Sequence, residues 1–130
     1  MGSQTILVAD DEPTIRAYIA RVLVTEGFRV VAAADGQDAL DQFRLLDGSI
    51  DLLLTDVRMP RMDGLALARS LVDLRPGVPV LFISGYPLDH ELRLWNSGNC
   101  FLRKPFTRQV LLDAVRKCLN VPVVGAGQSG

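Results

Sequence analysis

Five side chains that could bind a cation or transfer a group stand at the ends of short apolar runs: Asp10, Asp11, Asp56, Ser84 and Lys104. An apolar run of about four to eight residues between breakers is typical of a strand buried on both faces. Open α/β sheets bind their ligands beyond the carboxyl ends of such strands. We therefore expect these five side chains to meet at one edge of a sheet.

The three carboxylates would concentrate negative charge at short range, which is unfavourable unless protons or a cation neutralise it. Oxygen ligands without a nearby His or Cys suit Mg²⁺. Asp56 is then either a metal ligand only or also a nucleophile that forms an acyl phosphate, with Lys104 as a point charge on phosphate oxygens. The competing interpretation makes Asp10 and Asp11 solvated loop residues or helix caps, and Lys104 a surface lysine.

Alternating apolar patterns must position these side chains. The predicted strands cover residues 6–9, 30–32, 51–55, 80–83 and 100–102. Helical periodicity follows each of them, over residues 15–23, 39–46, 67–74, 88–95 and 111–118. Strands that alternate with helices predict a parallel sheet with right-handed crossovers and helices on both faces.

The composition narrows the functional class. A chain of 130 residues with a net charge of -1 predicts one domain without a nucleic-acid-binding surface. No apolar run approaches the roughly 20 residues of a membrane helix, and no signal-peptide core follows Met1, so we expect a cytoplasmic protein. Cys100 and Cys118 lack metal-ligand spacing and are expected to be small buried hydrophobes. Residues 121–130 are Gly-rich and expected to form a flexible tail.

A family pattern emerges when the motifs are taken together. The order Asp10-Asp11, Asp56-Val57-Arg58-Met59-Pro60, Asp63-Gly64, Ser84-Gly85 and Lys104-Pro105-Phe106 resembles the receiver domain of two-component response regulators. The resemblance covers residues 5–120. It implies a flavodoxin-like (βα)5 fold with a five-stranded parallel sheet in the order 2-1-3-4-5.

The resemblance also implies a phosphorylation site. Asp56 would accept a phosphoryl group from a sensor histidine kinase, a histidine phosphotransfer protein or a small acyl phosphate. Mg²⁺ would be bound directly by Asp11 and Asp56, through a water by Asp10, and by the backbone carbonyl of Arg58. Lys104 would supply the counter-charge to the phosphoryl group.

Switching is implied at two further positions. Ser84 would be the switch hydroxyl and Phe101 the switch aromatic, although Ser84 could instead cap a turn and Phe101 could be a core residue. The bond before Pro105 is expected to be cis. Partners or a second copy would dock on the face formed by the fourth helix, the fifth strand and the fifth helix, with Leu88–Trp95 as the candidate surface. His90 is expected to be a surface residue. Arg58 and Tyr86, both bulky, stand at the two positions that tune the lifetime of the aspartyl phosphate in this family, which implies a long-lived phosphoryl group.

Taken together, these features predict a phosphorelay switch and not a turnover enzyme. One rival is a receiver-like interaction module that works without phosphorylation. Another is a haloacid-dehalogenase-type phosphatase with an aspartyl nucleophile, but that family requires Asp-x-Asp after the first strand, where this sequence has Asp10-Asp11-Glu12-Pro13. The chain is expected to be either a stand-alone receiver or part of a longer protein.

Overall fold

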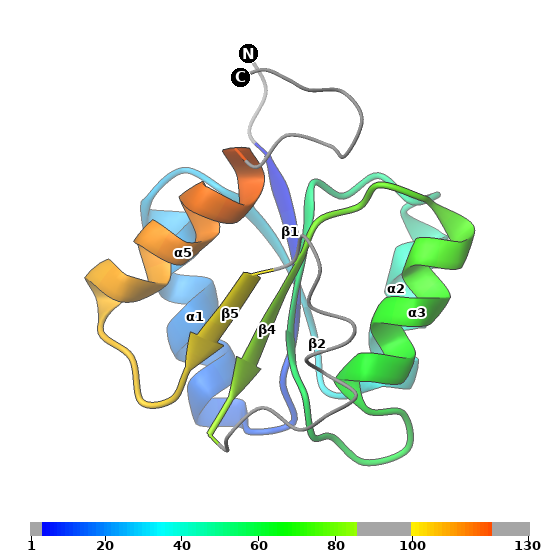
Figure 1. The fold of residues 1–130 in the computed structure, drawn as a ribbon, viewed down its shortest axis with the longest axis horizontal. Helices are drawn as coiled ribbons and strands as arrows, with labels where there is room; N and C mark the ends of the chain where they lie inside the picture. The colour runs from blue at the N-terminus through cyan, green and yellow to red at the C-terminus, as the bar shows by residue number, and fades with distance from the viewer. Residues whose placement is uncertain (1–3, 86–99, 121–130) are drawn as a thin grey trace.

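The computed structural model describes residues 4–85 and 100–120, and it contains one parallel sheet in the order β2-β1-β3-β4-β5 (Figure 1). This order is the predicted one. Its strands are β1 (Thr5–Ala9), β2 (Arg29–Ala33), β3 (Leu52–Asp56), β4 (Val80–Ser84) and β5 (Cys100–Arg103). The carboxyl ends of all five strands therefore lie at one edge, as the site requires.

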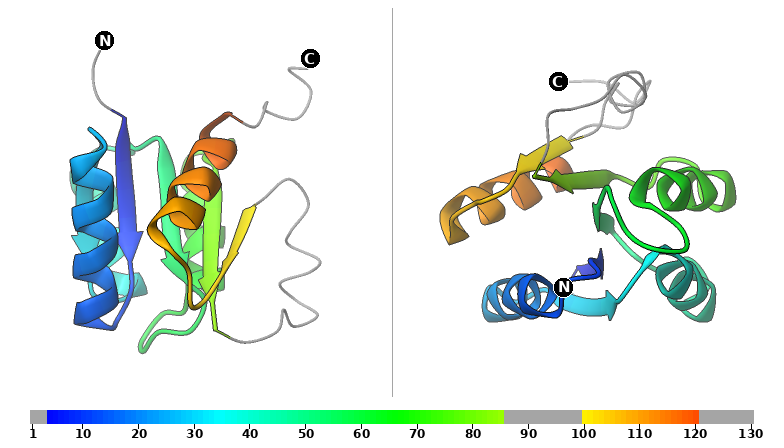
Figure 2. Two further views of the ribbon diagram at one scale, coloured as in Figure 1. Left: turned by 90° about the vertical axis from the view of Figure 1, so that its left-hand side faces the viewer. Right: turned by 90° about the horizontal axis from the view of Figure 1, so that it is seen from below.

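Helices cover both faces of the sheet, as predicted (Figures 1 and 2). One face carries α1 (Pro13–Thr25) and α5 (Arg108–Asn120), and the other carries α2 (Gly36–Leu45) and α3 (Gly64–Leu74). The fourth predicted helix, with Leu88–Trp95, His90 and Tyr86, lies outside the described residues. None of the helices in the described ranges is long and apolar enough to cross a bilayer.

Two apolar layers hold the sheet between its helices. Successive strand residues point to opposite faces, so Leu7, Leu53 and Phe82 pack with α2 and α3. Their chain neighbours Ile6 and Leu54 pack on the other face, with α1 and α5. Each fully buried side chain of this size stabilises the fold by about 1.5–3 kcal/mol relative to an exposed one, and the sheet is therefore a rigid base for the loops at its edge.

The strands extend slightly further than the apolar pattern predicted. Asp56 and Ser84 are the last residues of β3 and β4, not the first residues of loops. Asp56 is in register with Ile83, and Ser84 with Arg103. Backbone pairing in a parallel sheet depends little on side-chain polarity, so pairing continues to these polar residues and fixes their backbone positions.

Helical periodicity does not translate into burial at the end of α3. Leu74 is the last residue of the periodic stretch 67–74, but it is 53% exposed. It is the last residue of α3 and lines a shallow surface pocket with Phe43 and Arg75. The last residue of α3 thus lies beyond the apolar layer in which Leu67 and Leu71 are buried.

Candidate acidic site at the carboxyl edge of the sheet

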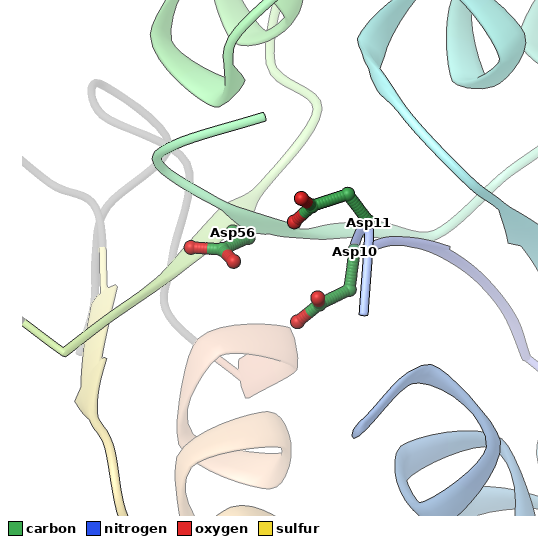
Figure 3. Close-up of side chains that lie close together, drawn as sticks. All are labelled: Asp10, Asp11 and Asp56. Atoms are coloured by element: carbon green, nitrogen blue, oxygen red, sulfur yellow. The ribbon is translucent and has the colours of Figure 1, made fainter. Parts of the chain in front are cut away.

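Three carboxylates meet where β1 and β3 end. Asp10, Asp11 and Asp56 each place an oxygen within 4.8 Å of the others, and Figure 3 shows the side chains of Asp10 and Asp11 beside that of Asp56. Asp10 is fully buried, Asp56 is nearly so, and Asp11 is exposed. Because β1 and β3 are paired neighbours, the sheet itself brings these residues together.

Lys104 supplies the positive charge at this cluster. Its ammonium lies 3.0 Å from Oδ2 of Asp56 and 3.5 Å from Oδ2 of Asp10. The lysine follows β5, its backbone N–H donates to the carbonyl of Ser84 at 2.9 Å, and the bond to Pro105 is cis. Burial alone would lower the pKa of Lys104, but the hydrogen bond to Asp56 and the two negative charges raise the pKa above its usual value.

The carboxylate of Asp10 is the least favourably placed charge of the site. Burial raises the pKa of its carboxyl and the charge of Asp56 raises it further, although the backbone N–H of Glu12 donates to Oδ1 at 2.9 Å and opposes the shift. Oδ2 is the single buried side-chain oxygen among residues 4–85 and 100–120 that lacks a hydrogen-bond partner. The Lys104 ammonium lies 3.5 Å from this oxygen without forming a hydrogen bond, so a proton or a closer cation would stabilise it further.

These residues fit Mg²⁺. The cluster offers only oxygen donors, one of them unsatisfied, in a site with excess negative charge. A cavity of about 450 Å³ opens over the cluster. It is lined by Asp11, Glu12, Asp56, Arg58, Ser84, Gly85 and Lys104. The cavity thus brings together the residues expected to bind metal and phosphoryl group, with Asp10 buried beneath them.

The two predicted switch residues are placed differently. Ser84 lines the cavity and is almost fully buried. Phe101 is half-buried in β5 and stacks on Phe82, with ring centroids 5.5 Å apart and an interplanar angle of 24°. Phe101 therefore packs against the α2–α3 layer and does not line the acidic cavity.

Backbone contacts constrain both ends of the loop that follows β3. The backbone N–H of Arg58 lies 3.4 Å from Oδ1 of Asp56, and the N–H of Gly64 donates to the carbonyl of Val57 at 2.8 Å. A Cβ at Gly64 would lie only 2.0 Å from the carbonyl oxygen of Asp56. Glycine at this position therefore lets α3 start directly against the end of β3.

Two residues of this region were not predicted to contribute. Arg61 donates from Nε at 2.9 Å and from Nη2 at 2.5 Å to Oδ2 of Asp35. The other Asp35 oxygen caps α2 by accepting from the N–H of Asp38 at 2.8 Å. Asp35 after a strand is a recognisable cap signal, whereas nothing in the sequence identifies Arg61 as its partner.

An apolar groove adjoins the acidic cavity and was also not predicted. It measures about 570 Å³ and is lined by Thr14, Ile15, Tyr18, Lys104, Pro105 and Phe106. The rings of Tyr18 and Phe106 lie 6.4 Å apart. Lys104 lines both spaces, so the groove lies between α1 and the acidic cavity.

Comparison with known proteins supports one family. Residues 6–116 match the model of the response regulator receiver domain. The chain is 37% identical over 121 residues to the sensor kinase CckA of Brucella abortus, with 92% of the chain and 13% of that protein covered. It is 38% identical over 117 residues to the transcriptional regulatory protein CpxR of Escherichia coli K12, with 88% of the chain and 49% of that protein covered.

Solved structures agree with the sequence comparison. A receiver domain protein of Clostridium thermocellum superposes with a TM-score of 0.81 at 33% identity, covering 90% of this chain and 94% of the other. The chain spans about half or less of the two curated relatives named above, a sensor kinase and a transcriptional regulator, so their common part is the receiver. The protein therefore belongs to the response regulator receiver family of two-component systems.

Proposed function

We propose that the chain is a phosphorylation switch in which Asp56 accepts a phosphoryl group. The observation that carries this proposal is the contact of 3.0 Å between the Asp56 carboxylate and the Lys104 ammonium, in a cavity that Asp11 and Glu12 also line. An aspartate at a strand end, beside a cavity and a fixed cation, is positioned to act as a nucleophile. Phosphoryl transfer depends chiefly on such positioning and on charge neutralisation.

The chemistry assigned to the residues is a single transfer. An oxygen of Asp56 bonds to phosphorus while the bond from phosphorus to the donor imidazole nitrogen breaks, and the freed imidazole leaves with the electron pair. Lys104 then neutralises a phosphoryl oxygen, and the Ser84 hydroxyl donates a hydrogen bond to another. Mg²⁺ held directly by Asp11, Asp56 and the carbonyl of Arg58, and through a water by Asp10, would neutralise charge on the transferring group.

Phosphorylation would alter the contacts of Lys104 and Ser84, and through them the neighbouring strands. The ammonium that now pairs with Asp56 would pair with the phosphoryl group instead. Rotation of Phe101 would require it to leave the ring of Phe82, on which it stacks. A pair of stacked rings that can adopt two arrangements is a suitable moving part for a switch. The result of switching would be a changed surface for an effector or a second copy to bind.

The phosphoryl donor is proposed to be the phosphohistidine of a sensor kinase or phosphotransfer protein. A protein donor must bring its imidazole to Asp56, and the apolar groove lies beside that residue, since Lys104 lines both spaces. Tyr18, Ile15 and Phe106 would give such a donor an apolar contact. A small acyl phosphate would reach Asp56 without using the groove.

Intact mass spectrometry tests the proposal. Wild type and Asp56→Asn are incubated with acetyl phosphate, with Mg²⁺ and with a chelator. The expected result is a Mg²⁺-dependent gain of one phosphoryl group in wild type and none in the variant. No gain in wild type under any condition would reject the phosphoacceptor and leave a receiver-like module that works without phosphorylation.

A further inference from the structure

We propose that Asp35 and Arg61 form a latch that holds residues 57–63 in the conformation required for Mg²⁺ binding. Both would be positioning residues, because neither lines the acidic cavity. The latch joins the start of α2 to the loop that follows β3. The inference rests on the metal site of the proposed function and assigns that site two residues outside the metal-ligand set.

The ion pair is anchored at its acidic end. Two N–H groups of one guanidinium converge on Oδ2 of Asp35, while Oδ1 is held by the backbone of Asp38. The hydrogen bond from Asp38 lowers the pKa of Asp35, and the hydrogen bond and charge of Arg61 lower it further. The side chain of Asp35 is only 10% exposed, so the acidic end of the pair is largely shielded from water, although Arg61 is 65% exposed.

A second contact fastens the loop beside the first. The backbone N–H of Gly36 donates to the carbonyl of Met62 at 3.1 Å. A Cβ at Gly36 would lie 2.1 Å from that oxygen, so the approach requires glycine. Arg61 has a φ of 66°, in the left-handed region that residues other than glycine rarely adopt. The ion pair therefore offsets part of the conformational free energy that the left-handed backbone at Arg61 costs.

These contacts determine how freely Arg58 can move. The loop is tied near its start by Arg58 to Asp56, at its end by Gly64 to Val57, and between them by the latch. Without the latch, the middle of the loop gains conformational freedom. The carbonyl of Arg58 would then have to be ordered when Mg²⁺ binds, and this entropy cost weakens affinity. The transfer step in the Mg²⁺-loaded protein would be unchanged.

Two variants remove the latch with little other damage. Arg61→Gln keeps most of the side-chain length, and Asp35→Asn keeps the cap of α2, because asparagine is an equally good N-cap. The Mg²⁺ affinity of the unphosphorylated protein is measured by calorimetry, and acetyl phosphate rates are measured at limiting and saturating Mg²⁺. We expect Kd to rise by up to about tenfold, the lower end of what outer-shell partners contribute, with rates restored at saturating Mg²⁺.

Matched variants separate the latch from general stability. Arg108→Gln removes an ion pair of similar length, 2.8 Å to Glu26 between α5 and α1, and should leave the Mg²⁺ Kd unchanged. Arg61→Lys should restore part of the affinity. In the metal-free protein, amides of residues 57–63 should exchange faster in Arg61→Gln than in wild type.

Two results would overturn the latch. One is a lowered Tm in Arg61→Gln and Asp35→Asn with an unchanged Mg²⁺ Kd, which would make the pair merely structural. The other is additive loss of affinity in the double variant, since partners in one interaction should not lose it twice. Failure of wild type to be phosphorylated would reject the phosphoacceptor alone, because calorimetry and exchange would still decide the latch.

Discussion

The acidic site has more negative than positive charge among its own residues. Asp10 and Asp56 share the single ammonium of Lys104, and the exposed Asp11 adds a third carboxylate. The shortest contact goes to Asp56, which leaves Oδ2 of Asp10 without a hydrogen bond. Removing charge from Asp10 should therefore help folding and harm metal binding, and these opposite effects can be measured separately.

Asp10→Asn is expected to stabilise the metal-free protein by about 1–2 kcal/mol at pH 7, since it removes a buried charge that lacks a full partner. The amide oxygen can still accept from Glu12, as Oδ1 does now. Because burial raises the folded-state pKa of Asp10 above 3.8, the wild type loses stability as pH rises through that pKa. Chemical denaturation from pH 3.5 to 8 should show the advantage of the variant growing with pH. An advantage that is constant across this range would contradict the assignment.

Gly64 provides a second test at the level of single residues. Gly64→Ala should lower the free energy of unfolding by about 1–3 kcal/mol, as overpacking does, because its Cβ would meet the carbonyl oxygen of Asp56. Alanine has the higher helix propensity, so a stabilised Gly64→Ala would contradict the close approach. Gly85→Ala is the matched control, since its Cβ would lie 3.9 Å from Lys104. Urea titrations of both variants measure the difference.

Some site residues could be predicted from sequence and others could not. Asp10 directly follows β1, and Asp56 and Ser84 are the last residues of β3 and β4. Because the apolar runs of these strands are unambiguous, the meeting of the three residues at one edge follows from the sheet alone. The pairing of Arg61 with Asp35 spans 26 positions and depends on a left-handed backbone at Arg61. No local pattern encodes that geometry.

Elements contribute surfaces that single residues do not. The groove forms because α1 and the segment between β5 and α5 lie beside each other on the same face of the sheet. Its apolar residues come from two distant parts of the chain. Ile15 is the first residue of the periodic stretch 15–23, yet the structure leaves it only partly buried, at the groove. Sequence predicted the helix but not what its first turns would adjoin.

If a protein donor docks at the groove, Tyr18→Ala should slow phosphotransfer from that donor by about tenfold, the effect of losing a moderate aromatic interface contact. Phosphorylation by acetyl phosphate should stay within about twofold, because Tyr18 does not line the acidic cavity. The measurement compares rates from a phosphorylated phosphotransfer protein with rates from acetyl phosphate.

Val24→Ala is the control for the groove, since Val24 lies on the same helix, is 57% exposed and does not line the groove. It should leave both rates unchanged. Equal slowing of the two reactions by Tyr18→Ala would point to damage at the acidic site and contradict a docking role.

At the scale of the whole molecule, the order of the strands in the sheet determines which residues meet at the acidic site. β1 and β3 are neighbours in the sheet, so the backbone pairing that supports the two apolar layers also brings Asp56, at the end of β3, beside Asp10 and Asp11, which follow β1. Alternating strands and helices made this architecture predictable, because right-handed crossovers leave few arrangements of five parallel strands. A cation that binds the cluster binds only a folded sheet.

Mg²⁺ should therefore raise the Tm of the whole protein. A ligand that binds only the folded state stabilises it by about 2.7 kcal/mol at a hundredfold excess over Kd. Asp11→Ala, which removes an exposed carboxylate of the cluster, should lose most of this gain, while Asp47→Ala, at a loop away from the cavity, should keep it. Calorimetric scans at increasing Mg²⁺, with Ca²⁺ and NaCl at matched ionic strength, separate specific binding from screening. Equal Mg²⁺ stabilisation of wild type and Asp11→Ala would place the cation elsewhere on the molecule.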